Sequence, residues 1–170
     1  MNPTWIIDRM ESNATVFEGL LRPVHPSQAK WKPAPEEWST LEVINHVADE
    51  ENEDFGTRLR LVLENPATEW PPIDPPRAVV ERQYNSRDIG ESLDRFLRAR
   101  AQSVAWLRGL QNPNWEAAHT RPAGGPLRAG DLLHSWLVHD LIHIRQINRL
   151  HYEYLAATSP RFSSAYAGDW

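Results

Sequence analysis

Two histidines one helical turn apart are the residues of this sequence whose types and spacing best suit metal chemistry. His139 and His143 stand at positions i and i+4 of a segment with helical periodicity. This spacing places their Cβ atoms about 6 Å apart on one helix face. Two such imidazoles can bind one ion at metal–nitrogen distances of about 2.0 to 2.1 Å. Two core histidines satisfied by hydrogen bonds would show the same spacing, and geometry alone leaves both interpretations open.

A third ligand would have to come from another segment, and His46 is the candidate. A helical wheel places His46 at the edge of the apolar arc of its segment, which suits a group that reaches into a cleft between helices. Asp49, Glu50 and Glu53 lie on the same side and are alternative ligands or partners of the ligands. Taken alone, these acids are more typical of a solvated helix face.

The remaining histidines are weaker candidates. His134 points roughly 160° to 180° away from the histidine pair on the helical wheel, so it cannot share their ion. His25 and His119 lie in irregular segments and His151 lies near a helix end, where histidines are usually surface residues. The loop that carries His119 could nevertheless fold over the cleft.

The segment around the histidine pair also invites comparison with zinc proteases. Asp140 stands where the helical H-E-x-x-H motif of those enzymes has its glutamate base. Aspartate is one methylene shorter, and no familiar third-ligand pattern follows the motif. The sequence therefore disfavours a protease.

Four segments show the apolar periodicity of helices and would position these side chains. A capping box, Ser39 with Glu42, marks the start of the second segment. The connection after it contains five prolines between residues 66 and 77 and is long enough to join two parallel helices. A short hairpin can form within residues 111–126. The predicted helices span about residues 4–21, 39–65, 85 or 86–110, and 128–154.

Composition limits the classes of protein to consider. The 170 residues suffice for one domain, with a core over about residues 4–154 and an unassigned tail at 159–170. The net charge of −5 and the lack of a basic stripe argue against nucleic-acid binding. There is no apolar leader and no run long enough to span a membrane, so we expect a cytoplasmic protein. Because cysteine is absent, imidazoles and carboxylates must hold any metal.

Three blocks of sequence resemble the DinB/YfiT-like superfamily. They are WKPAPEEWS at 31–39, EVINHVAD at 42–49 and HDLIHIRQI at 139–147, and the resemblance covers about residues 4–154. It implies an all-α, single four-helix bundle of up-down-down-up order. It also implies a divalent metal, commonly zinc or nickel, held by His46, His139 and His143, with Gln146 beside the ligands. Many members are dimers.

A homodimer is also compatible with a second apolar stripe on the last helix, although that stripe could equally pack within the bundle. The stripe consists of Leu133, Leu137, Leu141 and Ile144.

These features together predict a metal-dependent enzyme acting on a small molecule. Three neutral histidines leave a divalent ion its charge and an open coordination position, which can activate water or a low-molecular-weight thiol for attack on an electrophile. Asp49 or Glu50 would orient a ligand or move a proton, and Trp136 and Tyr154 would line the pocket. The alternative is a non-enzymatic metal- or ligand-binding stress protein that acts as a dimer.

Overall fold

The computed structural model describes residues 2–121 and 124–168. Most of this chain forms four long helical segments, and the second of these is composed of three consecutive elements. The long segments are α1 (Pro3–Leu21), α3 (Thr40–Asp49) with η1 (Glu50–Asp54) and α4 (Phe55–Glu64), α6 (Ile89–Gly109) and α7 (Ala129–Thr158). Shorter elements connect them: α2 (Pro26–Lys30), α5 (Pro75–Glu81), η2 (Tyr84–Ser86), β1 (Ala118–Thr120), β2 (Pro126–Arg128) and, in the tail, η3 (Ala165–Ala167).

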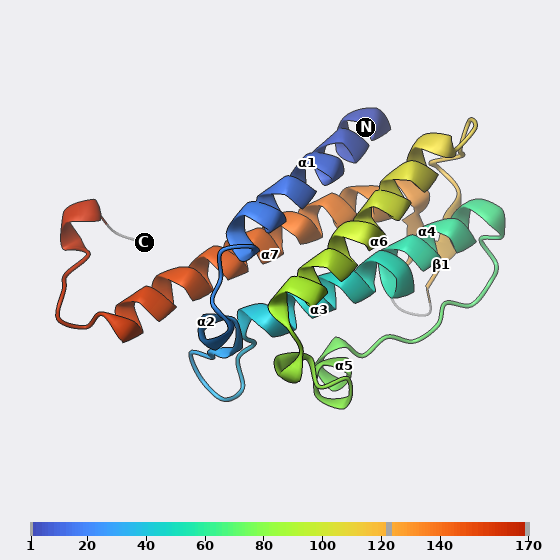
Figure 1. Cartoon of the computed structure of the whole chain (residues 1–170). Helices are drawn as coiled ribbons and strands as arrows, with labels where there is room; N and C mark the ends of the chain where they lie inside the picture. Colours follow the sequence, from blue (N-terminus) through green and yellow to red (C-terminus); the bar gives the residue numbers. More distant parts are fainter. Residues whose placement is uncertain (1, 122–123, 169–170) are drawn as a thin grey trace.

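The long segments form a four-helix bundle of up-down-down-up order, as predicted. In Figure 1, α1 and α7 run in one direction, and α3–α4 and α6 run in the other. The long connection from α4 to α6 returns along the outside of the bundle and carries α5. Two parallel helices require such a crossover, because their consecutive ends lie at opposite ends of the bundle.

The helix starts follow local capping chemistry. Ser39 and Glu42 form the predicted capping box of α3, in which each side chain accepts a hydrogen bond from the backbone N–H of the other residue. The start predicted for the third helix was wrong by three or four residues. The side chain of Asp88 accepts from the backbone N–H of Glu91 and starts α6 at Ile89, after the 3₁₀ turn η2.

The second long segment is not the uninterrupted α-helix that periodicity predicted. Residues Glu50–Asp54 form a π-helical turn between α3 and α4. Gly56 permits this turn, because a Cβ at that position would overlap the carbonyl oxygen of Glu51. Single π turns within α-helices occur often at functional sites.

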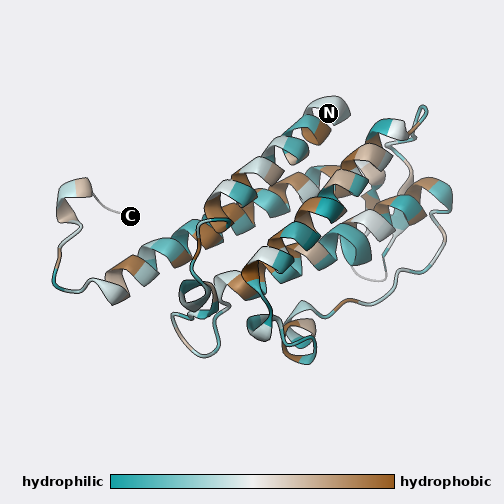
Figure 2. Cartoon of the chain, viewed as in Figure 1, coloured by the Kyte–Doolittle hydropathy of each residue, from teal (hydrophilic) through white to brown (hydrophobic). Residues whose placement is uncertain are grey.

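The core has two apolar ends separated by a polar layer. Phe17, Ile44 and Phe96 belong to one apolar cluster, and Met10 and Val104 belong to the other. Figure 2 shows hydrophobic and hydrophilic residues alternating along each helix of the bundle. Between the clusters lie polar and charged side chains that are all at most 8% exposed: Asn13, Glu51, Arg100, Asp140, His46 and His143.

The second apolar stripe of α7 is largely used inside the bundle. Leu133 and Leu137 are buried, and Ile144 packs against the core. Leu141 is 48% exposed. A homodimer therefore stays a prediction without that stripe as support.

The predicted hairpin forms between β1 and β2, which pair antiparallel with His119 opposite Leu127. Among the described residues, no helix is both long and apolar enough to cross a membrane.

Candidate metal centre

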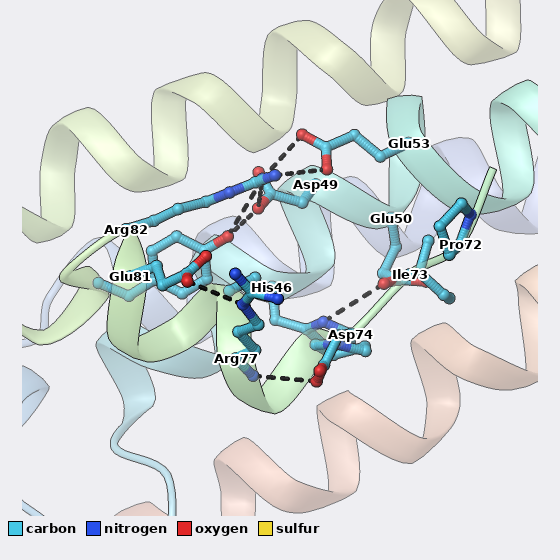
Figure 3. Close-up of a pocket in the computed structure, with 13 residues that line it drawn as sticks. His46, Asp49, Glu50, Glu53, Pro72, Ile73, Asp74, Arg77, Glu81 and Arg82 are labelled. Carbon is cyan, nitrogen blue, oxygen red and sulfur yellow. Dashed lines mark hydrogen bonds and ion pairs between the residues drawn. The ribbon is translucent and has the colours of Figure 1, made fainter.

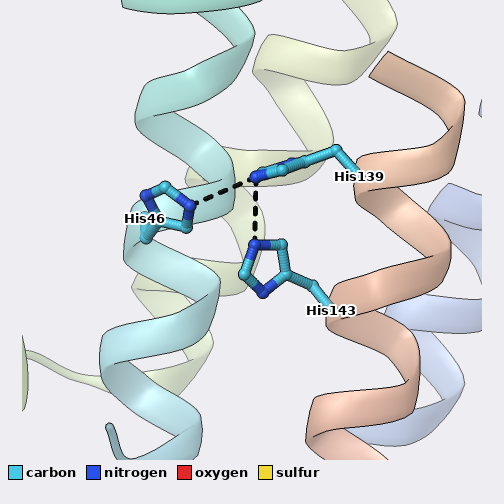
Figure 4. Close-up of side chains that lie close together, drawn as sticks. All are labelled: His46, His139 and His143. Carbon is cyan, nitrogen blue, oxygen red and sulfur yellow. Dashed lines mark hydrogen bonds between the residues drawn. The ribbon is translucent and has the colours of Figure 1, made fainter. Parts of the chain in front are cut away.

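Three histidines from two helices converge in the polar layer. His46 comes from α3, and His139 and His143 come from α7 (Figure 4). The Nε2 atom of His139 lies 3.3 Å from Nε2 of His46 and 3.0 Å from Nε2 of His143. One nitrogen from each ring can be chosen so that all three lie within 4.8 Å of one another.

All three imidazoles are neutral near pH 7. Burial, followed by the charge of His143, lowers the pKa of His46 to about 3. Burial also lowers the pKa of His139 to about 2, with smaller contributions from the other two histidines and Arg100. The pKa of His143 is lowered by burial as well, although Gln146 and Asp140 oppose the shift.

The tautomers follow from the partners of the Nδ1 atoms. His143 Nδ1 donates to the amide oxygen of Gln146 at 2.8 Å, so its Nε2 keeps a lone pair. His46 Nδ1 faces the Glu50 carboxyl group at 3.5 Å. The Nδ1 atom of His139 is buried and has no hydrogen-bond partner within the described part of the chain. The lone pair of His143 Nε2 thus points at Nε2 of His139, which can donate a proton to it in the metal-free protein. A divalent ion could take the place of that proton between the same nitrogens.

The donor set fits a divalent metal ion. Two nitrogens bound tetrahedrally at about 2.05 Å from zinc lie about 3.3 Å apart. The two Nε2 separations around His139 are 3.3 and 3.0 Å. The Nδ1 contact of His143 with Gln146 is the kind of outer hydrogen bond that orients a metal-binding imidazole.

His46 lies deeper than its place on the helical wheel suggested. All ten residues of α3 are buried, because α6, α7, α2 and α5 pack around it. His46, at the edge of the apolar arc of α3, is therefore enclosed like the residues at the centre of that arc. Trp38 packs edge-on against His46, and Phe55 packs against His139, which closes two sides of the histidine cluster.

Two of the predicted pocket residues do not line the cavity beside His46. Trp136 is 1% exposed, stacks on Phe55 and donates its indole N–H to Glu51 at 2.8 Å. Tyr154 lies about 16 Å beyond His143 along α7. Its ring packs edge-on against Trp31.

A polar cavity of about 190 Å³ adjoins the histidine cluster at His46 (Figure 3). Its walls come from the end of α3, from η1 and from the connection that carries α5. The charged residues that line it are Asp49, Glu50, Glu53, Asp74, Arg77, Glu81 and Arg82. The histidine cluster and the cavity thus share His46, and Glu50, which faces His46, also lines the cavity.

The two acids predicted to take part in chemistry differ in their surroundings. Asp49 accepts hydrogen bonds from Arg82, Arg95 and the hydroxyl group of Tyr84, so its carboxylate is fully engaged. Glu50 is 6% exposed and lines the cavity. Burial, then the hydrogen bond and negative charge of Asp54, raise the pKa of Glu50 to about 8. Glu50 can therefore exchange a proton near neutral pH.

The other histidines lie outside the cluster, but two are less exposed than predicted. His119 is 8% exposed; it stacks on Trp70, and its Nδ1 contacts the carbonyl oxygen of Pro66 at 2.8 Å. His151 is partly buried between Gln28 and the carbonyl oxygen of Leu20. The sequence did not indicate these partners because their hydrogen-bonding groups lie 53 to 131 residues away.

Asp140 points away from the histidines. It is 0% exposed and accepts two hydrogen bonds from Arg100, at 2.7 and 2.6 Å. It cannot act as the base of an H-E-x-x-H protease. Arg100 was not singled out from the sequence, although it stands between Phe96 and Val104 at helical spacing. A charge in the middle of an apolar stripe was the signal that could have identified it.

Comparisons with known proteins agree with the fold. The DinB superfamily profile matches residues 9–147. Among solved structures, YfiT from Bacillus subtilis, described as a probable metal-dependent hydrolase with an unusual four-helix bundle topology, is similar at a TM-score of 0.79 and 18% identity. The alignment covers 89% of this chain and 87% of that one. No curated protein matches the sequence. With most of its length matched by the family profile, the chain belongs to the DinB superfamily.

Proposed function

We propose that this protein is a metal-dependent enzyme in which His46, His139 and His143 bind a divalent ion, zinc or nickel. The observation that carries the proposal is the convergence of three neutral imidazole nitrogens beside a polar cavity. A divalent ion on three neutral histidines keeps its charge and an open position, which lowers the pKa of a water or thiol bound there. The description of YfiT as a probable metal-dependent hydrolase supports the same class.

The protein's own residues would hold the site and handle the proton. Gln146 fixes the ring of His143 through its amide oxygen. Glu50 faces both His46 and the cavity, and its raised pKa suits a group that takes up and releases a proton near pH 7. Asp49 holds the cavity wall through its arginine partners and does not take part in proton transfer.

The cavity indicates a small substrate. Its volume of about 190 Å³ is below the range of about 300 to 1,000 Å³ usual for drug-sized ligands. We propose attack by water or by a low-molecular-weight thiol on a small electrophile. The chain has no cysteine, so any sulfur nucleophile must come from a co-substrate.

The first test is metal content. We expect the isolated protein to contain about one divalent ion per chain, and His139→Ala to lose it. His134→Ala, on the exposed side of the same helix, is the matched control and should retain the metal. Equal metal content in both variants would refute the site.

The second test is activity. Hydrolysis of activated esters and transfer of small thiols to an electrophile are compared in metal-loaded and metal-stripped protein. We expect turnover only when metal is bound, and at least a hundredfold loss in Glu50→Gln with metal retained. Metal binding without turnover in either assay would favour the alternative, a non-enzymatic metal- or ligand-binding protein.

A further inference from the structure

A buried cluster of charges lies in the same polar layer as the histidines, and the proposed chemistry does not use it. Arg100 of α6 lies 2.6 Å from Glu51 of η1 and 2.6 Å from Asp140 of α7. All three side chains are at most 1% exposed. Asn13 of α1 donates to Asp140 at 3.1 Å, so each long segment of the bundle contributes a side chain.

The charges in this cluster do not balance. Two carboxylates face one guanidinium, which leaves one net negative charge in the core. The second carboxylate oxygen of Glu51 is buried and has no hydrogen-bond partner among the described residues. An unpaired charge in a protein interior is costly because water no longer solvates it.

Two residues of the charge cluster are sequence neighbours of residues at the histidine site. Asp140 follows His139 in α7, and Glu51 follows Glu50, which faces His46. Electrostatic interactions between buried groups are weakly screened.

We infer that Glu51, Arg100 and Asp140 are positioning residues whose uncompensated negative charge is balanced by the divalent cation at the three histidines. The histidines are neutral and bring no charge of their own, so this cluster supplies electrostatic attraction that the ligands lack. It also joins the two segments that carry the ligands, because Arg100 binds η1 and α7 at once. The inference rests on the proposed metal site.

Two measurements test the inference: the affinity for metal and the melting temperature of the metal-free protein, which should change in different ways. Glu51→Gln keeps the shape and the acceptor oxygen for Arg100 and Trp136 but removes the excess charge. We expect its affinity for Zn²⁺ and Co²⁺ to fall about 10- to 100-fold, while the melting temperature of the metal-free protein stays equal to or above that of the wild type. Asp140→Asn removes the same charge from the other side; because both oxygens of Asp140 accept from Arg100, only the metal affinity of this second variant is compared, not its stability. Glu11→Gln, which removes one carboxylate from a surface pair with Arg108, is the control and should change neither quantity.

The outcomes separate the inference from the proposed function. Affinity is measured by Co²⁺ absorption and by competition of Zn²⁺ with a chromophoric chelator. Normal binding by the wild type with unchanged affinity in both variants would overturn the inference alone. A metal-free Glu51→Gln protein that melts lower and also binds metal more weakly would overturn it too, because that result indicates a purely structural cluster. A wild type that binds neither metal would overturn the proposed site itself.

Discussion

Replacing Gly56 with alanine tests the π turn that shapes the wall of the site. In a regular helix this change stabilises a protein by up to about 1 kcal/mol, because alanine has the higher helix propensity. Here the new Cβ would overlap the carbonyl oxygen of Glu51 and lie 3.2 Å from a guanidinium nitrogen of Arg60. Backbone cannot yield as a flexible side chain does, and overpacking of this kind costs about 1 to 3 kcal/mol.

The expected net effect of Gly56→Ala is a loss of about 2 kcal/mol in the free energy of unfolding, which for a chain of this size lowers the melting temperature by roughly 4 to 8 °C. Metal affinity should fall as well. If the helix relieves the overlap by giving up its π turn, the segment that carries His46 and Glu50 rotates by about 100° relative to α4.

The matched control is Gly19→Ala. Gly19 lies in α1, and a Cβ there would meet nothing within 4 Å. This variant should melt at or slightly above the wild-type temperature and bind metal normally. Both variants are compared by thermal unfolding of the metal-free protein and by titration with Co²⁺. A Gly56→Ala protein as stable as Gly19→Ala would show that the π turn is not as tightly constrained as the structure implies.

Two further predictions concern the acids beside the histidines. The pKa of Glu50 is raised from 4.5 to about 8, so its contribution to stability is complete below pH 4.5 and is lost as pH rises toward 8. Unfolded histidines titrate near pH 6.5, and the lowered native pKa values of His46 and His139 give a slope of opposite sign, so the effect of Glu50 is measured as a difference. Relative to Glu50→Gln, the metal-free wild type should lose about 1 kcal/mol per pH unit between pH 6.5 and 8. The same pH dependence in both proteins would contradict the raised pKa of Glu50. Asp49→Asn should cost about 1 to 2 kcal/mol, because Arg95 loses a carboxylate partner, whereas the half-exposed Arg82 keeps its pair with Glu53. Metal affinity should stay within about threefold of the wild type; loss of metal with normal stability would instead make Asp49 a ligand.

Local chemistry made several features predictable from sequence. The convergence of His139 and His143 follows from the geometry of a single helix, in which positions i and i+4 always share a face. The start of α3 was also correct, because Ser39 and Glu42 form their capping box without help from the rest of the chain. The start of α6 was placed too early, since Asp88 competes as a cap with the polar residues just before it.

Only the tertiary structure decided what surrounds these helices. Burial of His46 depends on helices that pack on every side of α3, and a wheel describes one helix alone. Asp49 and Glu50 are adjacent acids in the sequence; they differ because arginines 33 and 46 residues away reach Asp49 and leave Glu50 facing the cavity. The π turn and the charge cluster around Arg100 likewise arise from packing, because the energy of a buried charge depends on partners that only the folded chain brings within reach.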